Sequence, residues 1–200
     1  MNRSRLFSFA FLLAAFSTVQ PSHAQSAVKR GLESMDFRPE TSGEGLLGPS
    51  VPQTEAFYAL RPPAGWRKKT YKGADRSLQF PLSFQDPKNA DSLTIGLIQG
   101  GPAVLTLESL SRFRGDYLGA VRKKGMGRII GTDMFRFRNY VCLQLLAERG
   151  RDVVLQLLVF DQPGSFLQVA YSLDKDHYHE KARTLEASIA SLEWPIFPDK

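Results

Sequence analysis

The stretch that decides the fold runs from Asn139 to Leu173 and reads NYVCLQLLAERGRDVVLQLLVFDQPGSFLQVAYSL. It holds three strand-length runs, residues 140–147, 152–160 and 166–173, separated by breaks of four and five residues. Breaks this short cannot contain a crossover helix, so neighbouring strands must run antiparallel. Pro163-Gly164 in the second break suits a type II turn, because proline presets φ and glycine tolerates the positive φ that follows. The stretch therefore predicts an antiparallel meander.

The alternation of side chains along these runs predicts how the sheet is covered. The first two runs carry apolar residues on both faces, which is typical of central strands covered on both sides. The third run is apolar on the face of Val169 and more polar on the face of Gln168 and Ser172. We therefore expect the third strand to lie nearer an edge or under thinner cover.

Two amphipathic helices are predicted to supply the cover. Residues 107–124 carry an apolar stripe at three- and four-residue spacing, with Thr106 placed as the N-cap. A C-terminal helix is expected after Asp176, which we assign as its N-cap, and Trp194 can extend its contact with the sheet. The predicted fold class is α+β, an antiparallel β-sheet sandwiched by helices (α/β/α).

Shorter strands are expected before the first helix and just after it. Residues 57–60 and 66–71 predict a hairpin broken by Pro62-Pro63, which belongs at the sheet margin or on a face because proline lacks the ladder N–H. Three further runs are predicted as strands: residues 78–84 with Pro81 inside, residues 92–99, and residues 128–137 with an interruption at 131–133.

The first residues have the pattern of an export signal. Arg3 and Arg5 precede a short apolar run over residues 6–16, and small residues lead to a cleavage site after Ala24. Cleavage removes two cations and no acid, so the formal net charge falls from +6 to +4. We expect a periplasmic or secreted protein without a stable membrane span after cleavage, and export argues against a nucleic-acid partner. The predicted divisions are a signal peptide (1–24), a flexible leader rich in Gly, Ser, Pro and Glu (25–55), and a single domain (56–200).

Candidate catalytic chemistry is confined to one cluster, which contains Asp176, His177, His179 and Glu180. The two histidines are two residues apart, so on a helix they point away from each other, unlike the i, i+4 pair of a zinc helix. Capping and the helix dipole already account for the two acids. Cys142 lies within an apolar run, as a buried cysteine does. We predict no catalytic residues, no metal and no cofactor.

A basic patch is the best candidate for a partner-facing surface. Arg122, Lys123 and Lys124 end the first helix and Arg128 follows closely, with Arg136 and Arg138 as further candidates on the next strand. Cations at a helix C-terminus are also expected on dipole grounds alone, so a solvated helix end remains the alternative interpretation.

The pattern FYALRPPAGW at residues 57–66, together with the order of elements up to Trp194, resembles the PsbP-like fold. That superfamily includes the extrinsic PsbP protein of photosystem II, a nuclear-transport Ran-binding factor and small exported bacterial proteins of the DcrB type. The resemblance implies binding or assembly work more often than catalysis, and it carries over no site residue. We expect an exported, non-enzymatic envelope protein that binds or helps assemble a protein partner. The alternatives are a small-ligand carrier, or a hydrolase or metal enzyme that uses the Asp176/His177/His179/Glu180 cluster.

Overall fold

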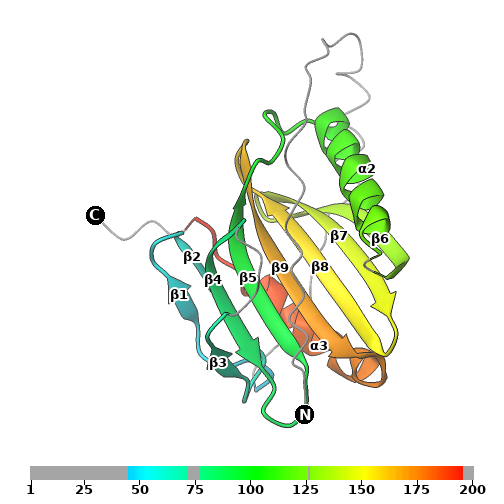
Figure 1. The fold of residues 1–200 in the computed structure, drawn as a ribbon. Helices are drawn as coiled ribbons and strands as arrows, with labels where there is room; N and C mark the ends of the chain where they lie inside the picture. Colours follow the sequence, from blue (N-terminus) through cyan, green and yellow to red (C-terminus); the bar gives the residue numbers. More distant parts are fainter. Residues whose placement is uncertain (1–44, 72–76, 126, 196–200) are drawn as a thin grey trace.

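The computed structural model describes residues 45–71, 77–125 and 127–195. Within them, a seven-stranded sheet has the order β3-β4-β5-β9-β8-β7-β6, and a separate two-stranded sheet pairs β1 with β2 (Figure 1). The strands are β1 (Val51–Gln53), β2 (Tyr58–Leu60), β3 (Arg67–Lys69), β4 (Leu78–Gln85), β5 (Ser92–Gln99), β6 (Arg128–Phe137), β7 (Tyr140–Arg149), β8 (Asp152–Phe160) and β9 (Ser165–Asp174), and the helices are α2 (Leu107–Lys123) and α3 (Lys175–Ala190). The predicted signal peptide and most of the predicted leader lie outside the described residues.

The predicted meander is confirmed. Strand β7 pairs antiparallel with β8, and β8 pairs antiparallel with β9, in unbroken register. Gly164 in the β8–β9 turn has φ 84°, the positive value that the second central residue of a type II turn requires. Every residue of β8 after Asp152 is buried, as the apolar residues on both faces of this strand predicted.

The edge position predicted for β9 is wrong, whereas the alternative of thinner cover holds at Ala170 and Ser172, which are half-buried. This strand is central, because β5 pairs with it along eight consecutive residues from Ser92 to Gln99 while β8 pairs with its other side. Its more polar face is nevertheless buried at Gln168, which is 4 % exposed. The polarity of the strand alone did not indicate its place in the sheet, because that place depends on pairing with β5, more than sixty residues earlier in the chain.

The two helices cover opposite faces of the sheet (Figure 1), so the predicted α/β/α sandwich is confirmed. The side chains of Leu110 and Phe113 in α2 are buried in one core cluster, where the Phe113 ring meets Phe160 and Phe166 edge-on at centroid distances of 5.5 and 5.6 Å. Thr106 caps α2 as predicted, in a reciprocal pair of hydrogen bonds with Ser109. Edge-to-face pairs of this kind stabilise a core by about 0.5–1.5 kcal/mol beyond their burial.

Helix α3 covers the other face, and its predicted N-cap is wrong by two residues. The cap is Asp174, whose carboxylate accepts the backbone N–H of Asp176 at 3.0 Å. Both residues are acids at a helix start, so the sequence allows either one to act as the cap; the end of β9 at Asp174 selects the first. Trp194, as predicted, extends the α3 side of the core and is 6 % exposed.

The N-terminal segment corrects two further predictions. Strands β2 and β3 do not form a hairpin with each other: β2 pairs with β1, whereas β3 is the edge strand beside β4. Because β1 begins at Val51, ordered structure starts before the predicted end of the leader at residue 55. An isolated bridge between Ala59 and Glu193 ties the small sheet to the chain just after α3.

Both interruptions predicted inside strands are irregularities of register within longer strands. Strand β4 continues through Pro81, with its register against β5 shifting between Gln79 and Leu82. Strand β6 likewise continues through its predicted break, with a register shift between Ile129 and Gly131. A shift of this kind redirects side chains locally without ending a strand.

Candidate functional site

The predicted basic patch begins at the C-terminal end of α2. Arg122 and Lys123 lie in its last turn and Lys124 is the C-cap residue, whose backbone N–H donates to the carbonyl of Ala120. The side chains of all three cations are exposed. Gly125, with φ 61°, then turns the chain away from the helix. The helix end therefore presents three positive charges to solvent.

Arg128 opens β6 and meets an acid on the neighbouring strand. Its guanidinium lies 2.6 Å from the carboxylate of Glu148, the residue opposite it in register, and Lys175 at the start of α3 lies 3.6 Å from the same carboxylate. The hydrogen bond and charge of Arg128, aided by Lys175, lower the pKa of Glu148 below its ordinary value. Part of the charge of Arg128 is thus offset within the fold.

The tertiary structure adds cations that the sequence analysis did not include. The backbone at Gly127 runs so close to the end of β7 that a Cβ built there would lie 2.4 Å from the carbonyl oxygen of Glu148 and 3.1 Å from Cβ of Arg149. The backbone carbonyl of Arg151, two residues further on, accepts the N–H of Lys175 at 2.9 Å. We call the resulting surface the basic end: Arg122, Lys123, Lys124, Arg128, Arg149, Arg151 and Lys175.

Positive charge is in excess at the basic end. Four acids lie on the strands and the helix start that form this end: Glu148, Asp152, Asp174 and Asp176. Glu148 is paired as described above, and Asp174 and Asp176 lie 3.5 and 3.4 Å from Arg151. Among the described residues, neither Arg122 nor Lys123 has a carboxylate within ion-pair distance. An acidic surface could therefore approach these two side chains without first displacing an internal partner.

Arg136 and Arg138 do not belong to the basic end. They lie at the opposite end of β6 from Arg128, about 30 Å away at the rise of a β-strand. The guanidinium of Arg138 donates to the carbonyls of Ala190 and Leu192, both at 2.9 Å, and so satisfies carbonyls at the end of α3. Arg138 therefore has a structural role, which the sequence pattern could not reveal.

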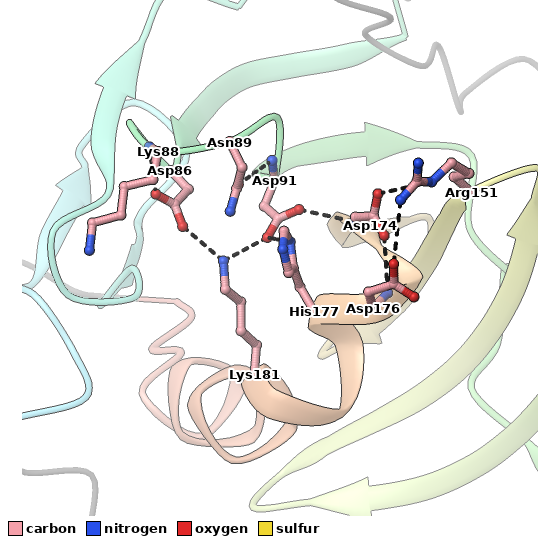
Figure 2. A network of polar contacts seen from close by, with 9 residues as sticks. All are labelled: Asp86, Lys88, Asn89, Asp91, Arg151, Asp174, Asp176, His177 and Lys181. Carbon is pink, nitrogen blue, oxygen red and sulfur yellow. Dashed lines mark hydrogen bonds and ion pairs between the residues drawn. The ribbon is translucent and has the colours of Figure 1, made fainter.

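The predicted histidine cluster is divided by the fold. The Nδ1 atom of His177 lies 3.0 Å from Oδ2 of Asp91 in the β4–β5 connection (Figure 2). The ring of His179, by contrast, is exposed and packs edge-on against Tyr178. Within the described residues, no group of three or more His, Cys, Asp or Glu side chains is arranged to hold a metal ion.

The polar network around Asp91 was missed by sequence reasoning. Asp91 is 1 % exposed; its Oδ1 accepts the backbone N–H of Asp174 at 3.0 Å, while its Oδ2 accepts from Lys181 Nζ at 2.6 Å in addition to the contact with His177 (Figure 2). Lys181 also donates to Asp86 at 2.8 Å. Two turns in the β4–β5 connection were the available signal, since Asp86 and Asn89 each accept the backbone N–H two residues later.

The electrostatics of the network favour the charged forms of its members. Burial alone would raise the pKa of Asp86, but hydrogen bonds from Lys181 and from the Lys88 backbone outweigh it and lower that pKa. Burial would likewise lower the pKa of Lys181, but hydrogen bonds to Asp86 and Asp91 raise it. Both oxygens of Asp91 are occupied by groups from β9 and α3. The network therefore fastens the start of α3 to the β4–β5 connection.

Cys142 is buried in the core on the α3 side of the sheet, as predicted. Burial raises the pKa of its thiol far above the ordinary value. The reactive thiolate is therefore strongly disfavoured at this position.

The arrangement of the elements defines the fold. An antiparallel sheet sandwiched between two helices in this order is the PsbP-like α+β fold. The solution structure of cyanobacterial PsbP (CyanoP) from Synechocystis sp. PCC 6803 is similar to this chain, with a TM-score of 0.56 and 16 % sequence identity over 78 % of this chain and 97 % of that one. No protein-family model matches the sequence, and no curated protein matches it. None of the helices within the described ranges is long and apolar enough to cross a membrane.

Proposed function

We propose that this chain is an exported, non-enzymatic protein of the cell envelope that binds or helps assemble a protein partner, and that the basic end is the surface through which it does so. The observation that carries the proposal is the convergence of exposed cations from α2, β6, the β7–β8 connection and α3 on one end of the sheet. The similarity to cyanobacterial PsbP is consistent with it at the level of the fold.

The chemistry of the basic end favours an acidic protein surface. Exposed cations raise the rate of encounter with a surface of opposite charge more than they deepen affinity, and salt screens the effect over about 8 Å at physiological ionic strength. The arginines of this end can also form paired hydrogen bonds with carboxylates. We therefore expect association that is fast at low salt and slows as salt is added.

The enzymatic alternative has little support from the geometry. His177 faces Asp91, whose two oxygens already receive three donors, and His179 stands apart from this network. The Nδ1 contact leaves Nε2 of His177 able to act as a base, but among the described residues no hydrogen bond joins this histidine to a serine or cysteine nucleophile. Metal analysis of the purified protein and a panel of hydrolase substrates test this alternative: stoichiometric zinc, or turnover that is lost in His177→Ala, would refute the proposal.

Site-specific photo-crosslinking in the intact envelope tests the surface. A photoreactive amino acid at Lys123 should capture one protein partner, whereas the same probe at Glu186, an exposed position on α3, should not. With that partner in hand, Arg122→Glu combined with Lys123→Glu should lower the association rate and flatten its salt dependence. If the association rate and its dependence on salt are unchanged in this variant, the basic end is a solvated surface that does not bind the partner.

Export is tested separately by intact-mass measurement. Protein recovered from the cell envelope should lack residues 1–24, because the signal pattern places cleavage after Ala24. Recovery of a chain that retains these residues would contradict the predicted processing. It would leave the prediction about the basic end to be judged by the crosslinking result.

A further inference from the structure

Two exposed phenylalanines have backbone conformations that phenylalanine rarely adopts. Phe57 has φ 54° and Phe80 has φ 49°; Arg138 is the third non-glycine residue with positive φ in the described part of the chain. A positive φ is uncommon for any residue with a side chain and is a genuine outlier for a bulky one. Such strain, of the order of 1–3 kcal/mol, occurs preferentially at functional sites.

Burial does not explain why phenylalanine occupies these positions. Phe57 is 48 % exposed and Phe80 is 39 % exposed, so each ring gains only part of the stability that a buried ring would supply. Glycine would fit both backbones with less strain. Neither local conformation nor core packing therefore accounts for the two rings. A contact with a surface outside the folded chain would account for them.

The surrounding structure links the two segments through the side chain of Tyr58. Phe80 lies at the register shift of β4, and its carbonyl oxygen is 2.5 Å from Oη of Tyr58, the residue that follows Phe57. The same hydroxyl lies 3.2 Å from the carbonyl of Ile95, and the amide of Gln53 also approaches the Phe80 carbonyl at 3.4 Å. Tyr58 is fully buried, so this arrangement is anchored in the core.

Three exposed cations lie on the strand next to the one that carries Phe80. Strand β3 is the edge strand next to β4, and its three residues, Arg67, Lys68 and Lys69, are all exposed. Lys69 is opposite Ser83, which is three residues from Phe80 and hence about 10 Å away along the strand. We call Phe57, Phe80 and these three cations the aromatic edge.

We propose that the aromatic edge binds the surface of an anionic phospholipid membrane. Lysine and arginine are attracted to anionic lipid headgroups, and aromatic rings favour the boundary between headgroups and acyl chains. The two rings come from separate segments, a turn before β2 and the register shift in β4. A lipid surface accepts such rings without matching pockets, whereas a protein partner would need two. Two rings and three cations give reversible association, because stable anchoring takes stronger signals.

This surface is distinct from the basic end. The aromatic edge belongs to the β3–β4 side of the large sheet, whereas the basic end is built around β6 and β7 on the other side. The inference therefore does not rest on the proposed protein partner. Variants of one surface leave the other intact, so the two proposals can fail independently.

Co-sedimentation with vesicles tests the inference. The chain from Gln25 onward should bind vesicles that contain phosphatidylglycerol and should bind phosphatidylcholine vesicles much less. Phe57→Gly combined with Phe80→Gly should weaken binding by about tenfold or more, since partial insertion of each ring contributes severalfold. The melting temperature of this double variant should be unchanged or higher, because glycine adopts a positive φ with less strain than phenylalanine does. Lys68→Glu combined with Lys69→Glu should also weaken binding, and added salt should reduce the effect of these charges.

Matched control variants separate binding through the aromatic edge from nonspecific binding to the vesicles. Val104→Ser alters an exposed apolar residue elsewhere and should bind the vesicles as the parent does. Arg122→Glu with Lys123→Glu changes the net charge by the same amount as Lys68→Glu with Lys69→Glu, so it should weaken binding only through general attraction to anionic lipid, and by less than the variant of the aromatic edge does. If the double glycine variant loses its fold, Phe80→Trp supplies a second measurement: bromine-labelled acyl chains should quench its added fluorescence beyond that of the parent. Absence of binding to anionic vesicles, binding unchanged in the folded double glycine variant, or absence of added quenching would each overturn the inference.

Discussion

Replacement of Asp91 by asparagine should destabilise the protein strongly, although Asp91 lies in a connection between strands. The carboxylate of Asp91 is almost completely buried and accepts from Lys181 Nζ at 2.6 Å and from the Asp174 backbone at 3.0 Å, with His177 Nδ1 also at 3.0 Å. Asparagine keeps an oxygen for the Asp174 N–H. Its amide, however, is neutral and turns a donor toward the ammonium group of Lys181.

The size of the effect follows from these contacts. Removing one partner of a buried ion pair commonly costs about 3–5 kcal/mol. Two features reduce that figure: the Lys181 side chain is 21 % exposed and keeps its contact with Asp86, and asparagine retains one hydrogen bond. We expect a loss of about 2–3 kcal/mol in the free energy of unfolding. For a domain of this size, that loss lowers the melting temperature by about 5–10 °C.

Urea denaturation and thermal melting followed by circular dichroism at neutral pH measure this loss. Asp86→Asn is the matched control and should cost only about 1 kcal/mol, because Lys181 keeps its closer contact with Asp91. The double variant Asp91→Asn/Lys181→Met should be less destabilised than the sum of the single variants, since it leaves no unpaired ammonium group. An Asp91→Asn variant that unfolds within about 0.5 kcal/mol of the parent would refute the structural role of the network.

Three further outcomes are expected. Leu157→Asp places a charge at a position that is 1 % exposed in β8 and should cost about 4 kcal/mol or more; a melting temperature within a degree or two of the parent would contradict the placement of β8. Gly127→Ala should destabilise by more than 1 kcal/mol in urea titrations, because the backbone has φ 116° and Cβ would meet the Glu148 carbonyl at 2.4 Å. The pKa of Asp86 is lowered by folding, so its contribution to stability is present above about pH 4 and is lost as pH falls through the pKa of the folded state. The pKa of Lys181 is raised by folding, so its contribution is present below about pH 10 and is lost as pH rises through the pKa of the folded state. Melting curves across pH should show both losses, and Lys181→Met should remove the alkaline one.

The sequence by itself determined the main elements of this protein. Strand β8 and helix α2 were predicted from periodicity, because an apolar run of alternating faces or a stripe at helical spacing records the burial of that element directly. The antiparallel direction of β7, β8 and β9 also followed from sequence, since short connections leave no alternative. These inferences depend on residues within one element or across one turn.

Tertiary structure decided where those elements lie and which side chains meet. It placed β9 in the centre of the sheet through pairing with β5, joined Asp91 to Lys181 across ninety positions of the chain, and brought Arg149 beside Gly127. It also assigned Arg138 to the end of α3. The sequence around a charged residue at the end of a helix or strand is the same whether its side chain is solvated, caps a helix or forms an ion pair. The choice among them depends on long-range strand pairing, which leaves no periodic signal in the residues themselves.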